Sequence, residues 1–234
     1  MKRAAVALAF LLLTVRPELV EGRVAGDMPS PPASIGSART VEGQSALDAE
    51  HAFAADAKTL GQWTAFRKWS TDDAVMFTPQ PVNAHEWLKG RNDPPKAIDW
   101  WPTASYISCD GSLAVNTGGW KRADGSVGYF TTLWQRQNNG DWKWTVDGGD
   151  ALKVSRPRQR PAVIKAICSN PPGMGMREGY PDGGGGVDSS EDGTLRFEFR
   201  VSPDGGRSVA ALLWDGRKFR RVIEDKTAGS PPNK

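Results

Sequence analysis

The side chains that could act as acids or bases follow a Trp-rich strand. Asp147 and Asp150 come directly after this strand and flank the pair Gly148-Gly149. A carboxyl group pushed into an apolar cavity can exchange a proton near neutral pH, as general acid–base catalysis requires. The alternative for both residues is turn formation around the two glycines. We take Asp150 as the candidate catalytic residue, with Tyr129 as its hydrogen-bond donor.

Metal and nucleophilic chemistry have little support in the sequence. The chain has 2 His, of which His51 follows Glu50 and His85 precedes Glu86, and we expect both imidazoles to be solvated. A zinc site needs three or four ligands close together, so no metal site is expected. The sequence also lacks a nucleophile elbow, a phosphate loop and a Cys-x-x-Cys pair. No cofactor is therefore expected.

The two cysteines, Cys109 and Cys168, are expected to form a disulfide. Residues 1–25 combine a basic start with the apolar run Ala4–Val15, which predicts a signal peptide or an uncleaved N-terminal anchor. The run is shorter than the roughly 20 residues of an ordinary membrane span, so we expect a periplasmic or secreted protein. An oxidising compartment favours the bond, which closes a loop worth about 4 kcal/mol. Two independent buried thiols are the alternative.

Composition bounds the remaining possibilities. The chain has 234 residues, 38% hydrophobic content and 10 Trp, and all the Trp except Trp214 fall between Trp63 and Trp144. This segment therefore holds a large aromatic core or an aromatic pocket. The net charge is +3, and the Arg residues near the C-terminus alternate with acids. A solvated surface is the better interpretation than a nucleic-acid site.

Periodicity and turn residues predict the elements that hold these side chains. Ser45 can cap a helix with Asp48 in the capping box, and a second helix covers 62–69. A strand at 74–78, a helix at 84–89 and a strand at 104–109 follow. No internal repeat is evident. The expected divisions are a linker at 26–44, a folded domain at 45–154, a Pro/Gly-rich connector at 155–193, a β-meander packed on that domain at 194–226, and a disordered tail at 227–234.

Two hairpins are expected within 112–150, with Asp124-Gly125 and Asn139-Gly140 as two-residue loops. This register places side chains on alternate faces of the sheet. One face would line a small-molecule pocket, or its aromatic side chains simply fill the core. That face holds Asn116, Trp120, Tyr129, Thr131, Leu133, Trp144 and Val146, and the other holds Phe130, Thr132, Trp134 and Asp147. The ligand-binding candidates are Trp63, Asn116, Trp120, Tyr129, Thr131 and Trp144.

Residues 45–152 resemble a known family. The resemblance is carried by Phe53-Ala54-Ala55, the pair Ala65-Phe66, the run 72–79 (DDAVMFTP), and Trp134 before 140–144 (GDWKW). It is to the SnoaL-like, ketosteroid-isomerase-like branch of the nuclear transport factor 2-like superfamily. The resemblance implies an α+β fold, in which a cone-shaped curved antiparallel sheet wraps a long N-terminal helix, and a homodimer through the outer sheet face. Enzymes of this branch use a pocket Asp with Tyr or His.

Two functions from different classes remain open. The first is an exported binding or accessory domain with an aromatic-lined pocket for a small apolar or aromatic ligand. The second is a small isomerase, dehydratase or hydrolase that acts on an apolar cyclic substrate. A carboxylate buried beside Tyr129 in the cone would favour the second function.

Overall fold

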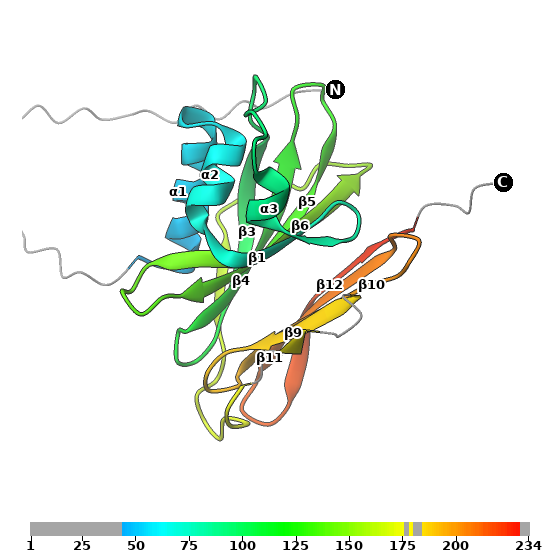
Figure 1. Ribbon diagram of the computed structural model, residues 1–234. Helices are drawn as coiled ribbons and strands as arrows, with labels where there is room; N and C mark the ends of the chain where they lie inside the picture. The colour runs from blue at the N-terminus through cyan, green and yellow to red at the C-terminus, as the bar shows by residue number, and fades with distance from the viewer. Residues whose placement is uncertain (1–43, 176–177, 180–183, 230–234) are drawn as a thin grey trace, which may run out of the picture. The chain divides into compact units, whose positions relative to one another are not determined.

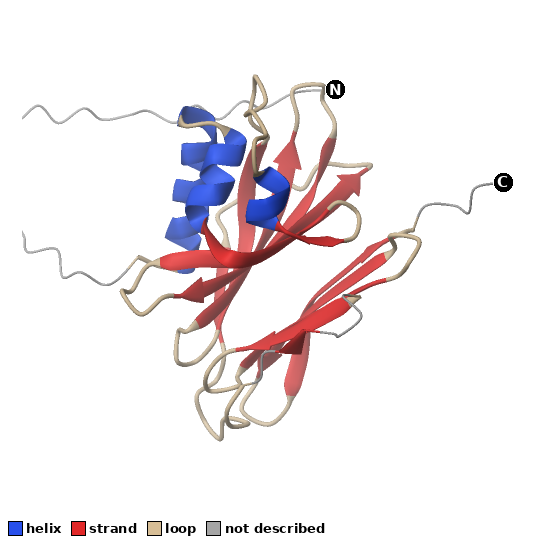
Figure 2. Cartoon of the chain, viewed as in Figure 1, coloured by secondary structure: helices blue, strands red, loops and turns tan. Residues whose placement is uncertain are grey.

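The computed structural model describes residues 44–175, 178–179 and 184–229. The expected signal peptide, the linker up to residue 43 and the last five residues of the tail lie outside this part. The described chain is an α+β structure with one large mixed sheet, one smaller antiparallel sheet and three helices. Figure 2 shows the helices gathered at the large sheet.

The first helix begins where its capping residue, Ser45, predicts. α1 spans Ala46–Thr59, α2 spans Gln62–Trp69 and α3 spans Ala84–Leu88. The Ser45 hydroxyl accepts the backbone N–H of Asp48, and the Asp48 carboxylate accepts the backbone N–H of Ser45, so the predicted capping box is confirmed. The buried stripe of α1 consists of alanines, Phe53 and one glutamate, Glu50. This stripe faces the large sheet, as Figure 1 shows.

The large sheet has seven strands in the order β2-β1-β6-β5-β4-β3-β7. The pairs β1–β6 and β3–β7 are parallel and the others are antiparallel. The strands are β1 (Ser70–Phe77), β2 (Pro81–Asn83), β3 (Asp99–Ile107), β4 (Leu113–Lys121), β5 (Val127–Arg136), β6 (Trp142–Leu152) and β7 (Ala162–Lys165). β3 therefore starts five residues earlier than the sequence predicts.

The second sheet is antiparallel, in the order β12-β11-β10-β9-β8. Its strands are β8 (Glu178–Gly179), β9 (Gly185–Ser189), β10 (Leu195–Val201), β11 (Arg207–Trp214) and β12 (Phe219–Thr227). β8 and β9 lie where the sequence predicts a long loop. The glycines of this stretch hide the strand periodicity, because they carry no side chain to alternate.

The register of the first hairpin differs from the prediction by one residue. Arg122 and Ser126 close the loop by a backbone hydrogen bond of 2.9 Å, so the loop has three residues rather than two. Trp120 consequently pairs with Gly128 instead of Tyr129. Because side chains alternate, a slip of one residue moves Tyr129 to the face opposite Trp120. The predicted grouping of these two residues on one face is therefore wrong.

The second hairpin also has a three-residue loop, closed by a 2.7 Å bond from the Gln137 N–H to the Asp141 carbonyl. Trp134 pairs with Trp144, while Leu133 pairs with Val146 as predicted. The irregularity leaves Thr145 as an extra residue in β6, a β-bulge. Trp144 and Trp134 therefore both lie on the helix-facing side of the sheet. The predicted register places them on opposite faces, so this part of the prediction is wrong.

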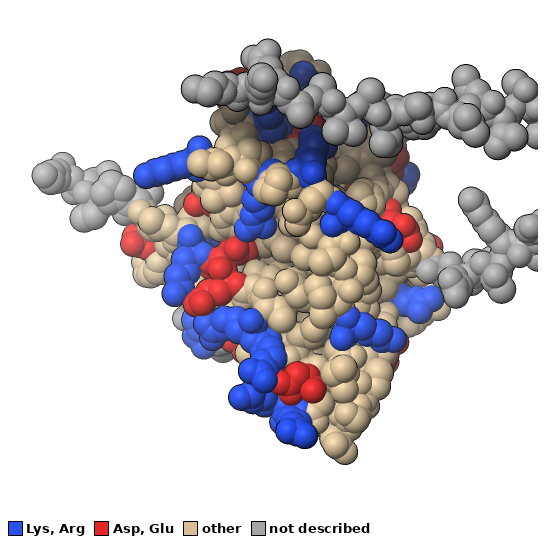
Figure 3. Space-filling model, turned by 180° about the vertical axis from the view of Figure 1, so that it is seen from behind, with Lys and Arg blue, Asp and Glu red and all other residues tan. Residues whose placement is uncertain are grey.

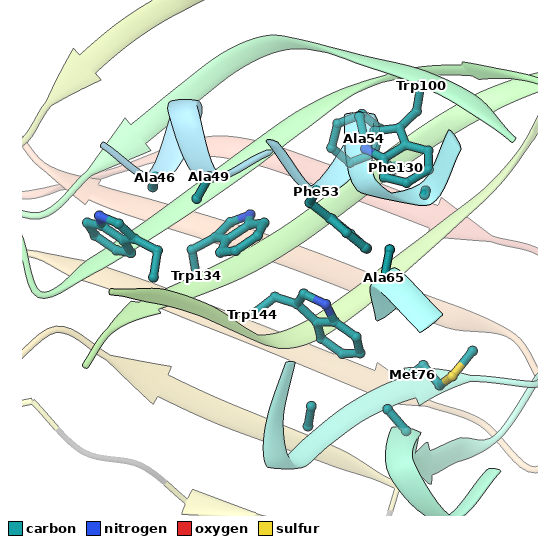
Figure 4. Close-up of a cluster of buried hydrophobic side chains, with 14 of the residues drawn as sticks. Ala46, Ala49, Phe53, Ala54, Ala65, Met76, Trp100, Phe130, Trp134 and Trp144 are labelled. Carbon is teal, nitrogen blue, oxygen red and sulfur yellow. The ribbon is translucent and has the colours of Figure 1, made fainter. Parts of the chain in front are cut away.

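The two faces of the large sheet belong to two separate cores. The helix-facing core includes Phe53, Trp134 and Trp144. Figure 4 shows Phe53 of α1 in the same cluster as these two indole rings, and its ring centroid lies 6.1 Å from that of Trp134. The other face packs against the second sheet. The core between the two sheets includes Leu113, Val115, Leu133 and Val146 of the large sheet and Leu195, Phe197, Phe199, Val209, Ala211 and Leu213 of the second sheet. The face expected for a homodimer is thus covered by the chain's own C-terminal strands.

Two turns of the same sequence pattern join the sheets. Residues 108–113 read SCDGSL and residues 190–195 read SEDGTL. The backbone N–H of Asp110 donates to the Asp192 carboxylate at 2.9 Å, and the reciprocal bond is also 2.9 Å. Beside them, Cys109 and Cys168 form a disulfide with Cα atoms 5.2 Å apart. The sequence predicts no repeat, because six residues are too few to stand out without this contact.

Candidate functional site

A small cavity lies between the helices and the large sheet, with a volume of about 90 Å³. Five aromatic side chains and two carboxylates are among its lining residues, whereas none of the lining residues in the described chain is Lys or Arg. The lining residues are Glu50, Phe53, Gln62, Phe66, Ile98, Trp100, Trp120, Phe130, Thr132 and Asp147. An apolar cavity with a few convergent polar groups is the usual form of a small-molecule site.

Glu50 reaches the cavity from the buried stripe of α1 and is 0% exposed. Its carboxylate accepts the indole N–H of Trp100 at 2.9 Å and that of Trp134 at 2.8 Å. The Asn116 amide lies 3.3 Å from the same carboxylate and also donates to the carbonyl of Ala46 at 2.8 Å. Burial raises the pKa of Glu50 to about 7, although these donors favour the charged form.

Asp147 supplies the second carboxylate of the cavity from β6. It accepts the hydroxyl of Thr132, its cross-strand neighbour on β5, at 2.6 Å. Burial raises the pKa of Asp147 to about 6, and the charge of Arg207 opposes that rise. The negative charge of Asp147 in turn raises the pKa of Glu50. Two carboxyl groups that titrate near neutrality therefore share one cavity.

The aromatic wall is set by the pairing of β3, β4 and β5. Trp100 and Trp120 are cross-strand neighbours, and the Trp120 indole N–H donates to the carbonyl of Tyr129 at 2.8 Å. The Trp120 ring lies against Gly128, where an added Cβ would come within 2.1 Å of the indole. Gly128 is therefore required for this ring position, which keeps Trp120 in the cavity wall.

The candidate pair Asp150 and Tyr129 does not line the cavity. The two residues are cross-strand neighbours on β6 and β5. The Tyr129 hydroxyl is 3.4 Å from the hydroxyl of Thr227 on the second sheet. Thr131, another ligand-binding candidate, donates to Asp225 of the same sheet at 2.6 Å. The one-residue change of register explains why these side chains face the second sheet.

The remaining candidates lie on the helix side. Trp120 lines the cavity. Asn116 orients Glu50, and Trp144 is fully buried in the core behind the cavity. Trp63 packs on Trp87 with ring centroids 5.7 Å apart and is not among the lining residues.

Glu50 is not among the site residues predicted from the sequence, which names it only as a neighbour of His51. A signal was present, because Glu50 lies on the apolar stripe of α1 between Ala46 and Phe53. A single carboxylate on a buried helical stripe has to find polar partners or a cavity. Its three donors come from β3, β4 and β5, which only the folded sheet brings together.

The described residues contain no group of three or more His, Cys, Asp or Glu side chains placed to hold a metal ion. No helix within the described ranges is long and apolar enough to cross a membrane. His51 is exposed, and the His85 imidazole lies 2.8 Å from the Ser70 hydroxyl, away from the cavity.

Comparisons with known proteins return structures and no sequence relatives. No protein family matches the chain, and no curated protein matches it. A "putative ketosteroid isomerase" from Parabacteroides distasonis ATCC 8503 is 16% identical with a TM-score of 0.41, covering 49% of this chain and 93% of that one. A second structure of that name, from Shewanella frigidimarina NCIMB 400, is 15% identical with a TM-score of 0.33, covering 47% and 98%. Both names fall in the branch that the sequence resembles, and at these TM-scores they carry no argument about activity.

Proposed function

We propose that the chain is an exported small-ligand-binding protein whose site is the cavity under α1. In this proposal, residues 45–154 form the cone of a SnoaL-like domain, and the second sheet is an extension that covers its outer face. The observation that carries the proposal is the lining, which combines five aromatic rings with two carboxylates in one cavity. The volume of about 90 Å³ limits the ligand to a small molecule.

Binding can be measured directly, because Trp100 and Trp120 line the cavity. Native mass spectrometry of protein purified from its own host should show a co-purified small molecule, and its release should change the tryptophan fluorescence. The variant Ile98→Phe, which fills the cavity, should abolish the retained mass. Val163→Phe on the exposed edge strand β7 is the matched control. Retention of the same molecule by Ile98→Phe would place the site elsewhere.

Acid–base catalysis is a second candidate, favoured by the two titrating carboxyl groups. At neutral pH, Glu50 and Asp147 lie close to their own pKa values, so one can accept a proton while the other donates one. This pair would suit an isomerase, dehydratase or hydrolase of a small cyclic substrate.

A proton-exchange experiment separates catalysis from binding. Small cyclic ketones incubated with the protein in D₂O should exchange their α-protons if the pair is catalytic. Glu50→Gln should stop the exchange while binding of the ketone persists, because the amide cannot accept the proton. Exchange at the same rate with and without Glu50 would remove the catalytic candidate and leave the binding function intact.

A further inference from the structure

We infer that the cavity under α1 binds a small organic cation, an alkylammonium group with methyl-sized substituents. The inference rests on the proposed binding function and names the chemical class of its ligand. It follows from three features of the cavity: the balance of charge, the aromatic lining and the volume.

The charge balance of the cavity is negative. The three donors that meet Glu50 are the side chains of Trp100, Trp134 and Asn116, all of them neutral. Asp147 accepts the Thr132 hydroxyl, which is neutral as well. A neutral apolar ligand would remove solvent from both carboxylates and offer them nothing in return. A cation would compensate their charge inside the cavity.

The opposing charge that acts on Asp147 belongs to Arg207, which is not among the lining residues of the cavity. This guanidinium acts on Asp147 electrostatically, but it donates to the carbonyl of Gly149 at 2.7 Å and stacks on Phe77 at 4.5 Å. Phe77 belongs to the core between the two sheets. Arg207 is therefore held on the other side of the large sheet. The space beside Glu50 can then be occupied by the positive charge of a ligand.

The aromatic side chains of the cavity also favour a cation. Phe53, Phe66, Trp100, Trp120 and Phe130 line the same space. Aromatic rings attract cations through the negative potential of their faces, most strongly where water is excluded. Aromatic cages with a nearby carboxylate are suited to quaternary ammonium groups, whose methyl surface also profits from apolar contact. The volume of about 90 Å³ restricts the ligand to a small head group and excludes large ring systems.

The decisive experiment compares a cation with its neutral isostere. Choline and 3,3-dimethylbutan-1-ol have the same shape and differ in charge, so calorimetry on the full chain at pH 8 isolates the effect of charge. We expect choline, and likewise tetramethylammonium, to bind at least about tenfold more tightly than the alcohol. Glu50→Gln and Asp147→Asn should each reduce this preference. Glu86→Gln, on the exposed side of α3, is the matched control.

A titration adds a readout that a purely structural role for the carboxylates would not change. Trp100, Trp134, Asn116 and Asp147 face Glu50, and Thr132 faces Asp147, while Arg207 acts on Asp147 from the other side of the large sheet. Among these groups, only the two carboxyls change charge between pH 8 and pH 5.5. Choline affinity should fall over this interval and alcohol affinity should not.

The outcomes separate the inference from the proposed function. Binding of the alcohol as tight as that of choline would overturn the cation and keep the binding site. Failure of choline, tetramethylammonium and the alcohol, with a neutral molecule retained from the host, would also overturn the cation alone. Failure of every probe, with nothing retained from the host, would overturn both.

Discussion

The two faces of the large sheet are built from the same strands and differ in how they treat charge. On the helix side, the buried Glu50 and the partly buried Asp147 have no cation among their hydrogen-bond partners. On the other side, Asp225 of β12 is also buried enough for its pKa to rise, yet Arg156 lies 3.9 Å from it and Thr131 donates to it. One face leaves its carboxylates uncompensated and the other compensates them.

The difference indicates which face is structural and which is functional. Buried charges that only hold a fold together are usually paired, because an unpaired charge in an apolar region is costly. In a ligand-binding site, a buried charge can lack a partner within the protein, because the ligand supplies the opposing charge. Asp225 of the C-terminal sheet follows the structural pattern, since Arg156 lies 3.9 Å from it. Figure 3 shows blue and red side chains interspersed on one surface of the molecule.

Removing the largest side chain of the helix-facing core should have the largest effect. Trp144 is 0% exposed, so Trp144→Ala should lower the free energy of unfolding by about 3–5 kcal/mol in urea titrations. Trp144→Phe should cost less, because the indole N–H finds no hydrogen-bond partner among the described residues. Trp87→Ala, at a partly buried position on α3, is the control. Equal small losses at positions 144 and 87 would contradict the assigned faces.

Removing the disulfide should destabilise the second sheet, which packs on the other face of the large sheet. The bond joins positions 59 residues apart, and replacing Cys109 and Cys168 by Ala should cost up to about 4 kcal/mol. Hydrogen exchange should then increase first in β9–β12, while α1 and the strands around the cavity keep their protection. A count of two free thiols per denatured, unreduced chain would show that the bond is absent. Uniform loss of protection would show that the faces are not independent.

The carboxylates on the helix side should make stability depend on pH. The pKa of Glu50 is about 7 in the folded protein against an ordinary value of 4.5, so the folded chain holds a proton that the unfolded chain has released. Stability should fall as pH rises from about 4.5 to 7, by on the order of 3 kcal/mol. Asp147 adds a change of the same sign between 3.8 and about 6. Urea midpoints of Glu50→Gln should show a weaker dependence, and an unchanged slope would contradict the uncompensated burial.

Substitutions in the two turns at 108–113 and 190–195 should have the smallest effect on the free energy of unfolding. Their effects should also be coupled. Asp110→Ala and Asp192→Ala should each cost about 1–2 kcal/mol, because each removes the acceptor for the other turn's N–H. The double variant should lose less than the two losses added together, since both changes break one shared contact. Asp124→Ala, in an exposed turn where the carboxylate accepts from Ser126, is the control. Strict additivity would mean that the turns act separately.

Local signals account for the parts of the fold that were predicted correctly. The capping box at Ser45 and the glycine at position 61 define the first helix, because both act within a few residues. The pairing of Leu133 with Val146 also follows from the sequence. The loop is one residue longer than predicted, which shifts the register by one residue, and the bulge at Thr145 shifts it back. The first hairpin has no such compensation, so its one-residue error moved Tyr129 and Thr131 to the wrong side.

The sequence by itself determined the α+β class, the main helices and strands, the aromatic enrichment between Trp63 and Trp144, and the two cysteines available for a bond. These features depend on residue type and local periodicity. Only the tertiary structure decided that Glu50 lies in a cavity, because its partners Trp100, Asn116 and Trp134 come from three strands far along the chain. Whether a carboxylate is solvated or uncompensated depends on what surrounds it, and that environment exists only after the helix packs on the sheet.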